Sequence, residues 1–355
     1  MKITRVRFEQ VRLFLHEPFV TAALARDFQP ALFVKIETDD GLSGFGEAIP
    51  TRHITGETLE SCMAAIKELG EKITGMNPFC VERIHAVMDK HLVMNTAAKA
   101  GIDIALYDIK GKALGQPLYK VLGGYGDSIE TDVTFSIMDN EELAAKAKKR
   151  VAEGYRILKI KTGLDVERDI EAVAKVRKAV GDGVTLKVDA NQGYSVSDAI
   201  KFINAAEKFG VRAYEQPCPC WDVNAMAAVR RGTGAKIIAD ESIRTHSDAI
   251  NYIRHEACDM MNIKLMKSGG IFKAEKINAV CEGAGITCMV GCMVESRVAI
   301  AAGVHFAVSK RNVTDADLDG FILTKELDFV SGGFSSEGGV LSPLDKPGLG
   351  LDINF

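Results

Sequence analysis

Short apolar strands alternate with amphipathic helices eight times along the chain, and this alternation limits the possible folds more than any other feature. Apolar spacing typical of helices fills the intervals, as at residues 141–153, 167–180 and 197–209. Strands that alternate with helices form parallel sheets, and eight such units predict a (β/α)₈ barrel. The strands are expected at Thr131–Ile137, Ile157–Lys161, Thr185–Asp189, Arg212–Glu215, Ile237–Asp240, Met260–Lys264, Thr287–Val290 and Val313–Asp317.

The first 124 residues have a different pattern, in which strands precede helices. We expect strands at 5–15, 31–37 and 42–47, a loop at Pro18–Pro30, and helices at 57–72, 77–91 and 97–114. The glycine-rich run 122–126 is a plausible boundary, and the glycine-rich segment 327–355 is expected to leave the barrel and pack on the N-terminal region. The fold expected is therefore an α+β capping domain, residues 1–124 with 325–355, on a barrel of residues 125–324.

Composition argues against several classes of function. A net charge of −4 argues against nucleic acid as the main partner. The sequence has no apolar run long enough to span a membrane, and its start lacks the apolar region of a signal peptide, so we expect a cytoplasmic protein without a membrane partner. The eight cysteines include no C-x-x-C pair and are expected to be reduced and mostly buried. Cys218-Pro219-Cys220 could bind a metal, but no second pair with zinc-finger spacing accompanies it.

Three acidic residues close three successive strands. Asp189, Glu215 and Asp240 are 26 and 25 residues apart, about one βα unit each, so they should meet at one rim of the barrel. Oxygen ligands with positions left open suit one Mg²⁺, or Mn²⁺, better than zinc. A helix N-cap is the alternative for any one of these acids, but three in step favour a metal site.

Lysines close two further strands. Lys159 and Lys161 share one face of the second strand, and Lys264 ends the sixth. Lys161 and Lys264 should lie across the barrel from each other with the acids between them, an arrangement that suits removal of a proton next to a carboxylate. The charges of Mg²⁺ and Lys159 are expected to lower the pKa of such a base. Lys267 is expected to face away or to open the next loop.

These residues resemble the motifs of the enolase superfamily, in its muconate-lactonizing-enzyme subgroup. The similarity covers nearly the whole chain and implies a modified TIM-type barrel with a capping domain. The matching segments are Lys159-Ile160-Lys161, Asp189-Ala190-Asn191, Glu215-Gln216-Pro217, Asp240-Glu241-Ser242 and the run 262–270.

One further motif resembles the dipeptide epimerases of this subgroup. Asp317-Leu318-Asp319 follows the eighth strand, where the resemblance implies that the two carboxylates bind the α-ammonium of a dipeptide. A solvated acidic loop that includes Asp315 is the alternative. The resemblance also implies substrate contacts from Thr134 and from Cys292, Met293 and Val294, and an enolate-neutralising role for Lys159.

The sequence departs from this resemblance in the loop Pro18–Pro30. Family members that act on Ala-Glu share Thr21-Ala22 but carry an arginine where this chain has Leu24, with Arg26 two residues on. Phe19 and Phe28 add apolar surface. We therefore expect the loop to close over an apolar or aromatic C-terminal side chain.

The residues and the resemblance together imply a Mg²⁺-dependent isomerase, a homo-oligomeric dipeptide epimerase that uses Lys161 and Lys264 as its two bases. The alternatives within the subgroup are a muconate cycloisomerase, an o-succinylbenzoate synthase and an N-acylamino acid racemase. A non-catalytic metal-binding structural protein is the alternative from another class.

Overall fold

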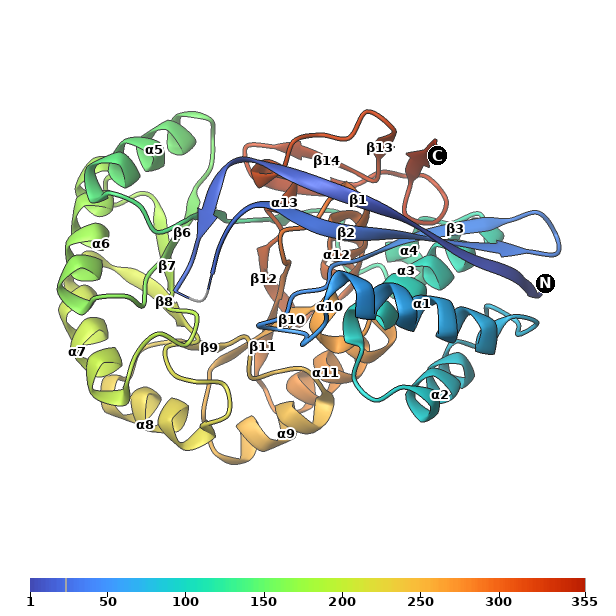
Figure 1. Cartoon of the computed structure of the whole chain (residues 1–355). Coiled ribbons are helices and arrows are strands. Elements are labelled where there is room, and N and C mark those ends of the chain that lie inside the picture. The colour runs from blue at the N-terminus through green and yellow to red at the C-terminus, as the bar shows by residue number, and fades with distance from the viewer. Residues whose placement is uncertain (23, 355) are drawn as a thin grey trace.

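The computed structural model describes residues 1–22 and 24–354, and its centre is a barrel of eight parallel strands (Figure 1). Each strand pairs with the next one along the chain, and a parallel bridge between Thr131 and Ala316 joins the two ends of the sheet. The predicted barrel is confirmed. Its strands are β5 (Val133–Phe135), β6 (Ile157–Lys161), β7 (Thr185–Asp189), β8 (Val211–Glu215), β9 (Ile237–Ala239), β10 (Met260–Lys264), β11 (Thr287–Gly291) and β12 (Val313–Asp317).

Helices surround the barrel, and several of them start at a side chain that caps the first turn. Asp165, Ser195, Thr245 and Ser296 each accept a hydrogen bond from a backbone N–H of the first turn of the helix that follows. The apolar stripes of these helices then pack on the strands. The helices are α5 (Asn140–Ala152), α6 (Val166–Val180), α7 (Val196–Ala206), η1 (Glu207–Phe209), α8 (Val223–Thr233), α9 (His246–Arg254), α10 (Leu265–Ser268), α11 (Ile271–Gly283), α12 (Arg297–Ser309) and α13 (Gly320–Leu323).

The N-terminal residues form an antiparallel sheet covered by helices. The sheet contains β1 (Ile3–Val20), β2 (Ala25–Thr38) and β3 (Ser43–Ala48), and the helices are α1 (Leu59–Ile73), α2 (Val81–His91), α3 (Thr96–Ala113) and α4 (Leu118–Val121). Helix α3 is buried on nearly all sides, between this sheet and α10 and α11 of the barrel. Gly46 permits the close approach, because a Cβ there would lie 2.1 Å from the carbonyl oxygen of Gly101 in α3.

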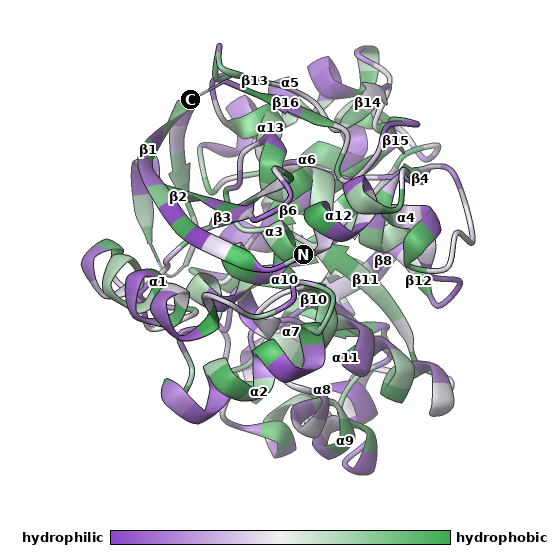
Figure 2. Ribbon diagram, turned by 90° about the vertical axis from the view of Figure 1, so that its right-hand side faces the viewer, coloured by the Kyte–Doolittle hydropathy of each residue, from purple (hydrophilic) through white to green (hydrophobic). Residues whose placement is uncertain are grey.

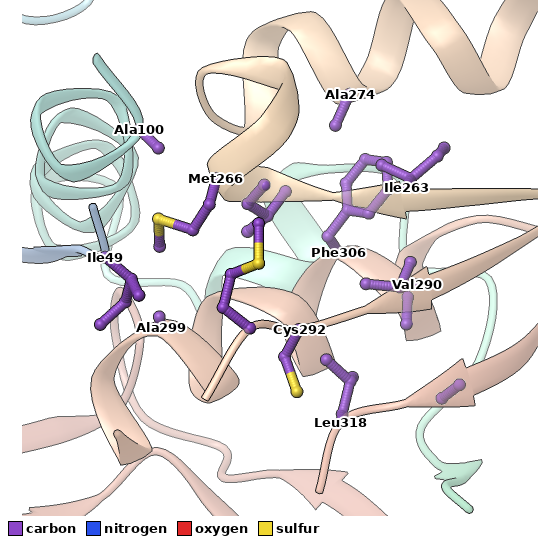
Figure 3. Close-up of a cluster of buried hydrophobic side chains, with 14 of the residues drawn as sticks. Ile49, Ala100, Ile263, Met266, Ala274, Val290, Cys292, Ala299, Phe306 and Leu318 are labelled. Carbon is purple, nitrogen blue, oxygen red and sulfur yellow. The ribbon is translucent and has the colours of Figure 1, made fainter. Parts of the chain in front are cut away.

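One continuous apolar core joins the cap to the barrel. Figure 3 shows Ile49 and Ala100 of the cap beside Met266 and Ala299 of the barrel. All four side chains are buried. Figure 2 shows apolar residues on α3 and α12 in the interior, with hydrophilic residues on the outer faces of the surrounding helices. The cap and the barrel are therefore packed together tightly enough to form one site between them.

The predicted loop Pro18–Pro30 is mostly strand, and that prediction was wrong. β1 and β2 continue as a long two-stranded ribbon to a short turn, closed by the hydrogen bond from Thr21 N–H to Leu24 C=O, 2.9 Å. A register shift between Phe14 and Phe19 accommodates Pro18. The ribbon gains partners that the local sequence does not show: Val20 C=O accepts from Ile137 N–H and Phe14 C=O from Lys325 N–H.

The C-terminal segment contains short strands and touches both parts of the molecule. β15 pairs with β4 (Ile129–Glu130), a short strand that precedes the barrel strands, while the ring centroid of Phe329 lies 6.0 Å from that of Phe33 in the cap. Leu349 N–H donates to Asp108 of α3 at 2.9 Å. The strands of this segment are β13 (Val330–Gly332), β14 (Phe334–Glu337), β15 (Val340–Pro343) and β16 (Leu351–Ile353). None of the helices in the described part of the chain is long and apolar enough to cross a membrane.

Candidate active site

A cavity of about 100 Å³ lies at the C-terminal ends of the barrel strands, beneath the turn of the β1–β2 ribbon. The barrel contributes lysines and acids to its wall, including Lys161, Lys264, Asp317 and Asp319. The cap contributes Phe19, Thr21, Leu24, Arg26, Thr51, His53 and Ile54. The cavity therefore joins charged groups of the barrel to a lid of mixed character, in which Phe19, Leu24 and Ile54 are the apolar residues.

Asp189, Glu215 and Asp240 meet as the spacing predicts. Asp189 and Glu215 are paired in register at the ends of β7 and β8, and Asp240 directly follows β9. One carboxylate oxygen from each lies within 4.8 Å of the others, and all three residues are buried. This set of hard oxygen donors fits Mg²⁺ or Mn²⁺.

Lys161 and Lys264 stand on β6 and β10, on either side of the acids. Lys161 Nζ lies 2.6 Å from Asp189 Oδ2, and Lys264 Nζ lies 2.8 Å from Asp240 Oδ2. Lys159 is fully buried, with its Nζ 2.8 Å from Glu215 and 2.8 Å from Asp317. The structure thus brings the three predicted lysines into one charged cluster.

The prediction for Lys267 was wrong. Its Nζ points into the cluster and donates to Asp240 Oδ1 at 2.6 Å and to Asn262 C=O at 3.0 Å. The short helix α10 begins directly after Lys264, and its turn brings Lys267 back over Asp240. Asp240 therefore pairs with two buried ammonium groups, Lys264 at Oδ2 and Lys267 at Oδ1, which offsets the cost of burying these charges.

Polar side chains within the quoted motifs, to which the sequence analysis gave no role, hold the acids in place. Asn262 donates to Glu215 Oε1 at 2.8 Å, and the side chain of Gln216 accepts from Asp240 N–H at 2.9 Å. Gln216 has φ +35° and Asn191 has φ +42°, values that are rare outside glycine and are often found at functional sites. Gly291 leaves room for Asn262, since a Cβ there would lie 2.5 Å from the amide oxygen.

The charges of the cluster set the pKa values of its members. Burial alone would lower the pKa of Lys264, but the carboxylates around it, Asp240 foremost with Glu215 and Asp317, together outweigh burial and raise it. The charge of Lys159 lowers the pKa of Lys264 as expected, but the carboxylates raise it by more. Burial, followed by the charge of Asp189, raises the pKa of Glu215 to about 7. The expected net lowering depends on the charge of Mg²⁺ as well as on Lys159, so it stays a prediction.

Asp317 and Asp319 form a buried acidic pocket beside Thr134. Thr134 N–H donates to Asp319 Oδ2 at 2.6 Å, and the hydroxyl of Thr134 donates to Asp317 Oδ1 at 3.3 Å. Burial, together with the charge of Asp317, raises the pKa of Asp319 to about 6, whereas Lys159 holds the pKa of Asp317 low despite burial. Both residues are buried, so the alternative of a solvated acidic loop is not observed. Asp315 pairs separately with Arg212.

Most residues expected to contact substrate line the cavity. Thr134, Cys292, Met293, Val294, Leu24 and Arg26 all do so, and burial lowers the pKa of Arg26. Phe19 lines it too, whereas Phe28 is 41% exposed and packs on Phe14 outside it, against our expectation. Residues on β2 alternate in direction, so Arg26 and Phe28 share a face, but only Arg26 is near enough to the turn to reach the barrel. His53 and Glu241 were missed, since neither ends a strand.

Two family models match the chain. A model of the mandelate racemase / muconate lactonizing enzyme N-terminal domain matches residues 3–123. The enolase C-terminal domain-like model matches residues 142–355.

Two curated relatives and a solved structure are similar over almost the whole chain. A hydrophobic dipeptide epimerase of Enterococcus faecalis is 41% identical over 99% of both chains. An L-Ala-D/L-Glu epimerase of Clostridium acetobutylicum is 40% identical over 95% of both. The crystal structure of the dipeptide epimerase from E. faecalis V583 with Mg and the dipeptide L-Leu-L-Tyr superposes with a TM-score of 0.97, at 41% identity, over 99% of this chain and 100% of the other.

Proposed function

The chain belongs to the mandelate racemase / muconate lactonizing enzyme family of the enolase superfamily, and from this premise we propose that it epimerises dipeptides at the α-carbon of the C-terminal residue. It is an epimerase or racemase that acts on dipeptides or amino acid derivatives. Family membership argues against the alternative of a non-catalytic structural protein. The proposal names the C–H bond that is broken, the residues that remove and return the proton, and the substrate side chain that is preferred.

The observation that carries the proposal is a pair of acidic sites of different composition at the C-terminal ends of the barrel strands. Asp189, Glu215 and Asp240 form one, and Asp317 and Asp319 form the other, with Lys159 between them. A dipeptide has a carboxylate at one end and an ammonium at the other. The first acidic site would hold Mg²⁺ against the carboxylate, and the second would accept the ammonium.

Lys161 and Lys264 are the proposed bases. In one direction a neutral Lys161 Nζ takes the α-proton from one face of the C-terminal residue. The protonated Lys264 then gives a proton to the opposite face, which inverts the configuration, and the roles exchange in the reverse direction. Mg²⁺, when bound, supplies positive charge that stabilises the electron-rich carboxylate left by proton removal. Lys159 adds a fixed positive charge that stabilises the same negative charge.

The cap turn is proposed to choose the C-terminal side chain. Leu24 stands where family members that act on Ala-Glu carry an arginine, and Phe19 and Ile54 add apolar surface nearby. A buried glutamate side chain without a cationic partner would be costly, whereas a leucine or phenylalanine side chain would gain from burial. The similarity to a hydrophobic dipeptide epimerase supports the same choice.

Exchange of the α-proton with solvent tests the proposal directly. The protein with Mg²⁺ should incorporate deuterium from D₂O at the α-carbon of the C-terminal residue of Ala-Leu or Ala-Phe, with inversion, and not at the N-terminal residue. Mass spectrometry of each residue and chiral chromatography give the two readouts. Exchange confined to the N-terminal residue, or none in a dipeptide library, would refute the assignment.

The remaining alternatives act on substrates that carry no free ammonium group. Muconate cycloisomerase and o-succinylbenzoate synthase substrates have none, and the substrates of an N-acylamino acid racemase have theirs acylated. None of them explains a buried pair of carboxylates at the end of β12.

A further inference from the structure

A second cavity, of about 270 Å³, opens beside the acidic pocket. It shares Phe19, Thr134 and Leu323 with the active-site cavity, so the two meet where Thr134 contacts Asp317 and Asp319. Its other walls come from the β1–β2 ribbon, the loop after β5, helix α5 and helix α13. Figure 1 shows the ribbon crossing over α13 toward α5. We refer to this space as the side cavity.

The side cavity has an apolar interior and a basic rim. Leu15, Phe135 and Ile322 line the interior. The rim carries Lys146, Lys149 and Arg150, which are spaced along one side of α5. Against these three cations, Glu17 is the one carboxylate among the lining residues that the structure describes.

The rim cations are held by acids that lie near the surface. Lys146 contacts Glu17 across the gap between barrel and cap, and its Nζ is 2.9 Å from Glu142. Arg150 lies 2.8 Å from Glu153. The side chains of Lys146 and Arg150 are only 28% and 32% exposed, whereas Glu17 is 62% exposed. A ligand carboxylate could therefore replace Glu17 beside half-buried cations, while Glu17 returns to water at little cost.

The position of the ammonium site determines which part of a dipeptide points here. If Asp317 and Asp319 bind the α-ammonium, the carbon that carries it also carries the side chain of the N-terminal residue. That side chain starts at the junction of the two cavities. We propose that the side cavity is the subsite for the N-terminal side chain, and that its rim selects an acidic one, glutamate in particular. This inference rests on the proposed function.

Glutamate satisfies both parts of the side cavity. Its two methylene groups would lie against the apolar interior, and its carboxylate would reach Lys146 and Arg150 at the rim. A lysine side chain would be repelled by the same cations. Lys149 is 79% exposed and contributes less, because water screens its charge.

The experiment compares N-terminal residues on one common C-terminal residue. kcat and KM are measured for Glu-Leu, its neutral isostere Gln-Leu, Ala-Leu and Lys-Leu, by deuterium exchange at the α-carbon of leucine. Glu-Leu should exceed Gln-Leu by about fivefold in kcat/KM, the range of a partly exposed charged hydrogen bond. The difference should lie in KM, because the side chain is remote from the reacting carbon, and it should shrink at 1 M salt.

Matched variants of α5 assign the effect to the rim. Lys146→Met and Arg150→Met should each reduce the Glu-Leu over Gln-Leu ratio toward one while leaving Ala-Leu turnover within about twofold of the original. Lys148→Met removes the same charge from an exposed position on the same helix and should leave the ratio unchanged.

Each outcome decides a separate point. Gln-Leu used as well as Glu-Leu, with Ala-Leu turned over normally, would overturn the subsite and leave the proposed function standing. An equal loss of the preference in Lys148→Met and in Lys146→Met would also overturn the subsite. It would show that the preference comes from the overall positive charge of the helix and not from contacts at the rim. No exchange with any of the four dipeptides would refute the proposed function and this inference together.

Discussion

Lys159 and Asp317 form a buried ion pair, with Nζ 2.8 Å from Oδ2. The same ammonium lies 2.8 Å from Glu215, so one lysine connects the acidic pocket to the proposed metal ligands. Burial raises the pKa of Asp317, but the charges of Lys159, Lys264 and Lys161 together lower it further, with Lys159 the largest of the three. A substrate that spans the two acidic sites would therefore lie along Lys159.

The acidic pocket should require a free ammonium on the substrate. We expect Asp317→Asn combined with Asp319→Asn to reduce kcat/KM for Ala-Leu at least a hundredfold, because charge-assisted hydrogen bonds are worth about 1.5–3 kcal/mol each. N-acetyl-Ala-Leu should already be a poor substrate of the unmodified protein. Efficient turnover of the acetylated compound would point to an N-acylamino acid racemase instead.

The same pocket gives a pH dependence. Asp319 has its pKa raised to about 6, so it loses its charge as the pH falls through that value. kcat/KM for dipeptides should therefore decrease as the pH is lowered below about 6. The Asp319→Asn variant should show low activity at every pH and should lack this acidic limb of the pH profile. A limb unchanged in Asp319→Asn would assign the titration to another group.

The two lysines should serve opposite stereoisomers. Lys161→Ala should abolish epimerisation, by a factor of about 10³ or more, because the proton can no longer leave or return on that face. Exchange of the α-proton of one isomer through Lys264 should survive in this variant, and the mirror result should hold for Lys264→Ala. Proton NMR in D₂O with L,L and L,D substrates measures both. Interconversion at the original rate in either variant would exclude a two-base reaction.

Metal removal should abolish activity and lower stability. Asp189, Glu215 and Asp240 bring three buried carboxylates within 4.8 Å, and a divalent ion would relieve their repulsion. Treatment with a chelator should therefore stop exchange and lower the melting temperature, and added Mg²⁺ should restore both. Chelator saturated with Mg²⁺ is the control. Full activity after removal would contradict the metal site.

The cap turn should favour apolar C-terminal residues. Burying a leucine or phenylalanine side chain gains roughly 1.5–3 kcal/mol, which corresponds to a preference of about ten to a hundred and fifty over a residue that gains nothing. We expect kcat/KM to be higher for Ala-Leu and Ala-Phe than for Ala-Glu, and Leu24→Arg to raise the value for Ala-Glu. A preference for Ala-Glu that vanishes in Arg26→Ala would reverse this assignment and make Arg26 the contact to glutamate.

His305 should make the fold sensitive to acid. Its Nδ1 accepts from Tyr119 N–H at 3.0 Å, and its Nε2 lies 3.2 Å from Leu349 C=O, so it joins α12 to α4 and to the C-terminal segment. Burial lowers its pKa to about 4, below the unfolded value of about 6.5. Because the unfolded chain binds the proton more tightly, stability is full above pH 6.5 and is lost as the pH falls toward 4.

The expected loss between pH 7 and pH 4.5 is roughly 2–3 kcal/mol from this residue alone. Urea unfolding of His305→Gln, which retains an acceptor and a donor, should show a correspondingly smaller difference between these two pH values. His255→Gln, at an exposed position, is the control and should behave like the original protein.

The spacing of residues along the chain predicted those features of the site that follow from the geometry of a parallel barrel. Strands of known direction carry their last residues to one rim, so Asp189, Glu215 and Lys264 could be placed from sequence and were found together. Contacts between distant segments could not be predicted in this way. The ribbon takes its hydrogen-bond partners from Ile137 and Lys325, which lie far away in the sequence. The direction of the Lys267 side chain depends on a one-turn helix, and four residues are too few to show a helical pattern.

The β1–β2 ribbon, held by Val20 to Ile137 of the barrel and by Phe14 to Lys325 of the C-terminal segment, borders both cavities. In the proposed assignment its turn meets the C-terminal side chain and its flank at Glu17 meets the N-terminal one, while no residue of the ribbon belongs to the set that moves protons. A single hairpin could then be exchanged between relatives to change both halves of the accepted dipeptide at once. Substrate range would evolve independently of catalytic power.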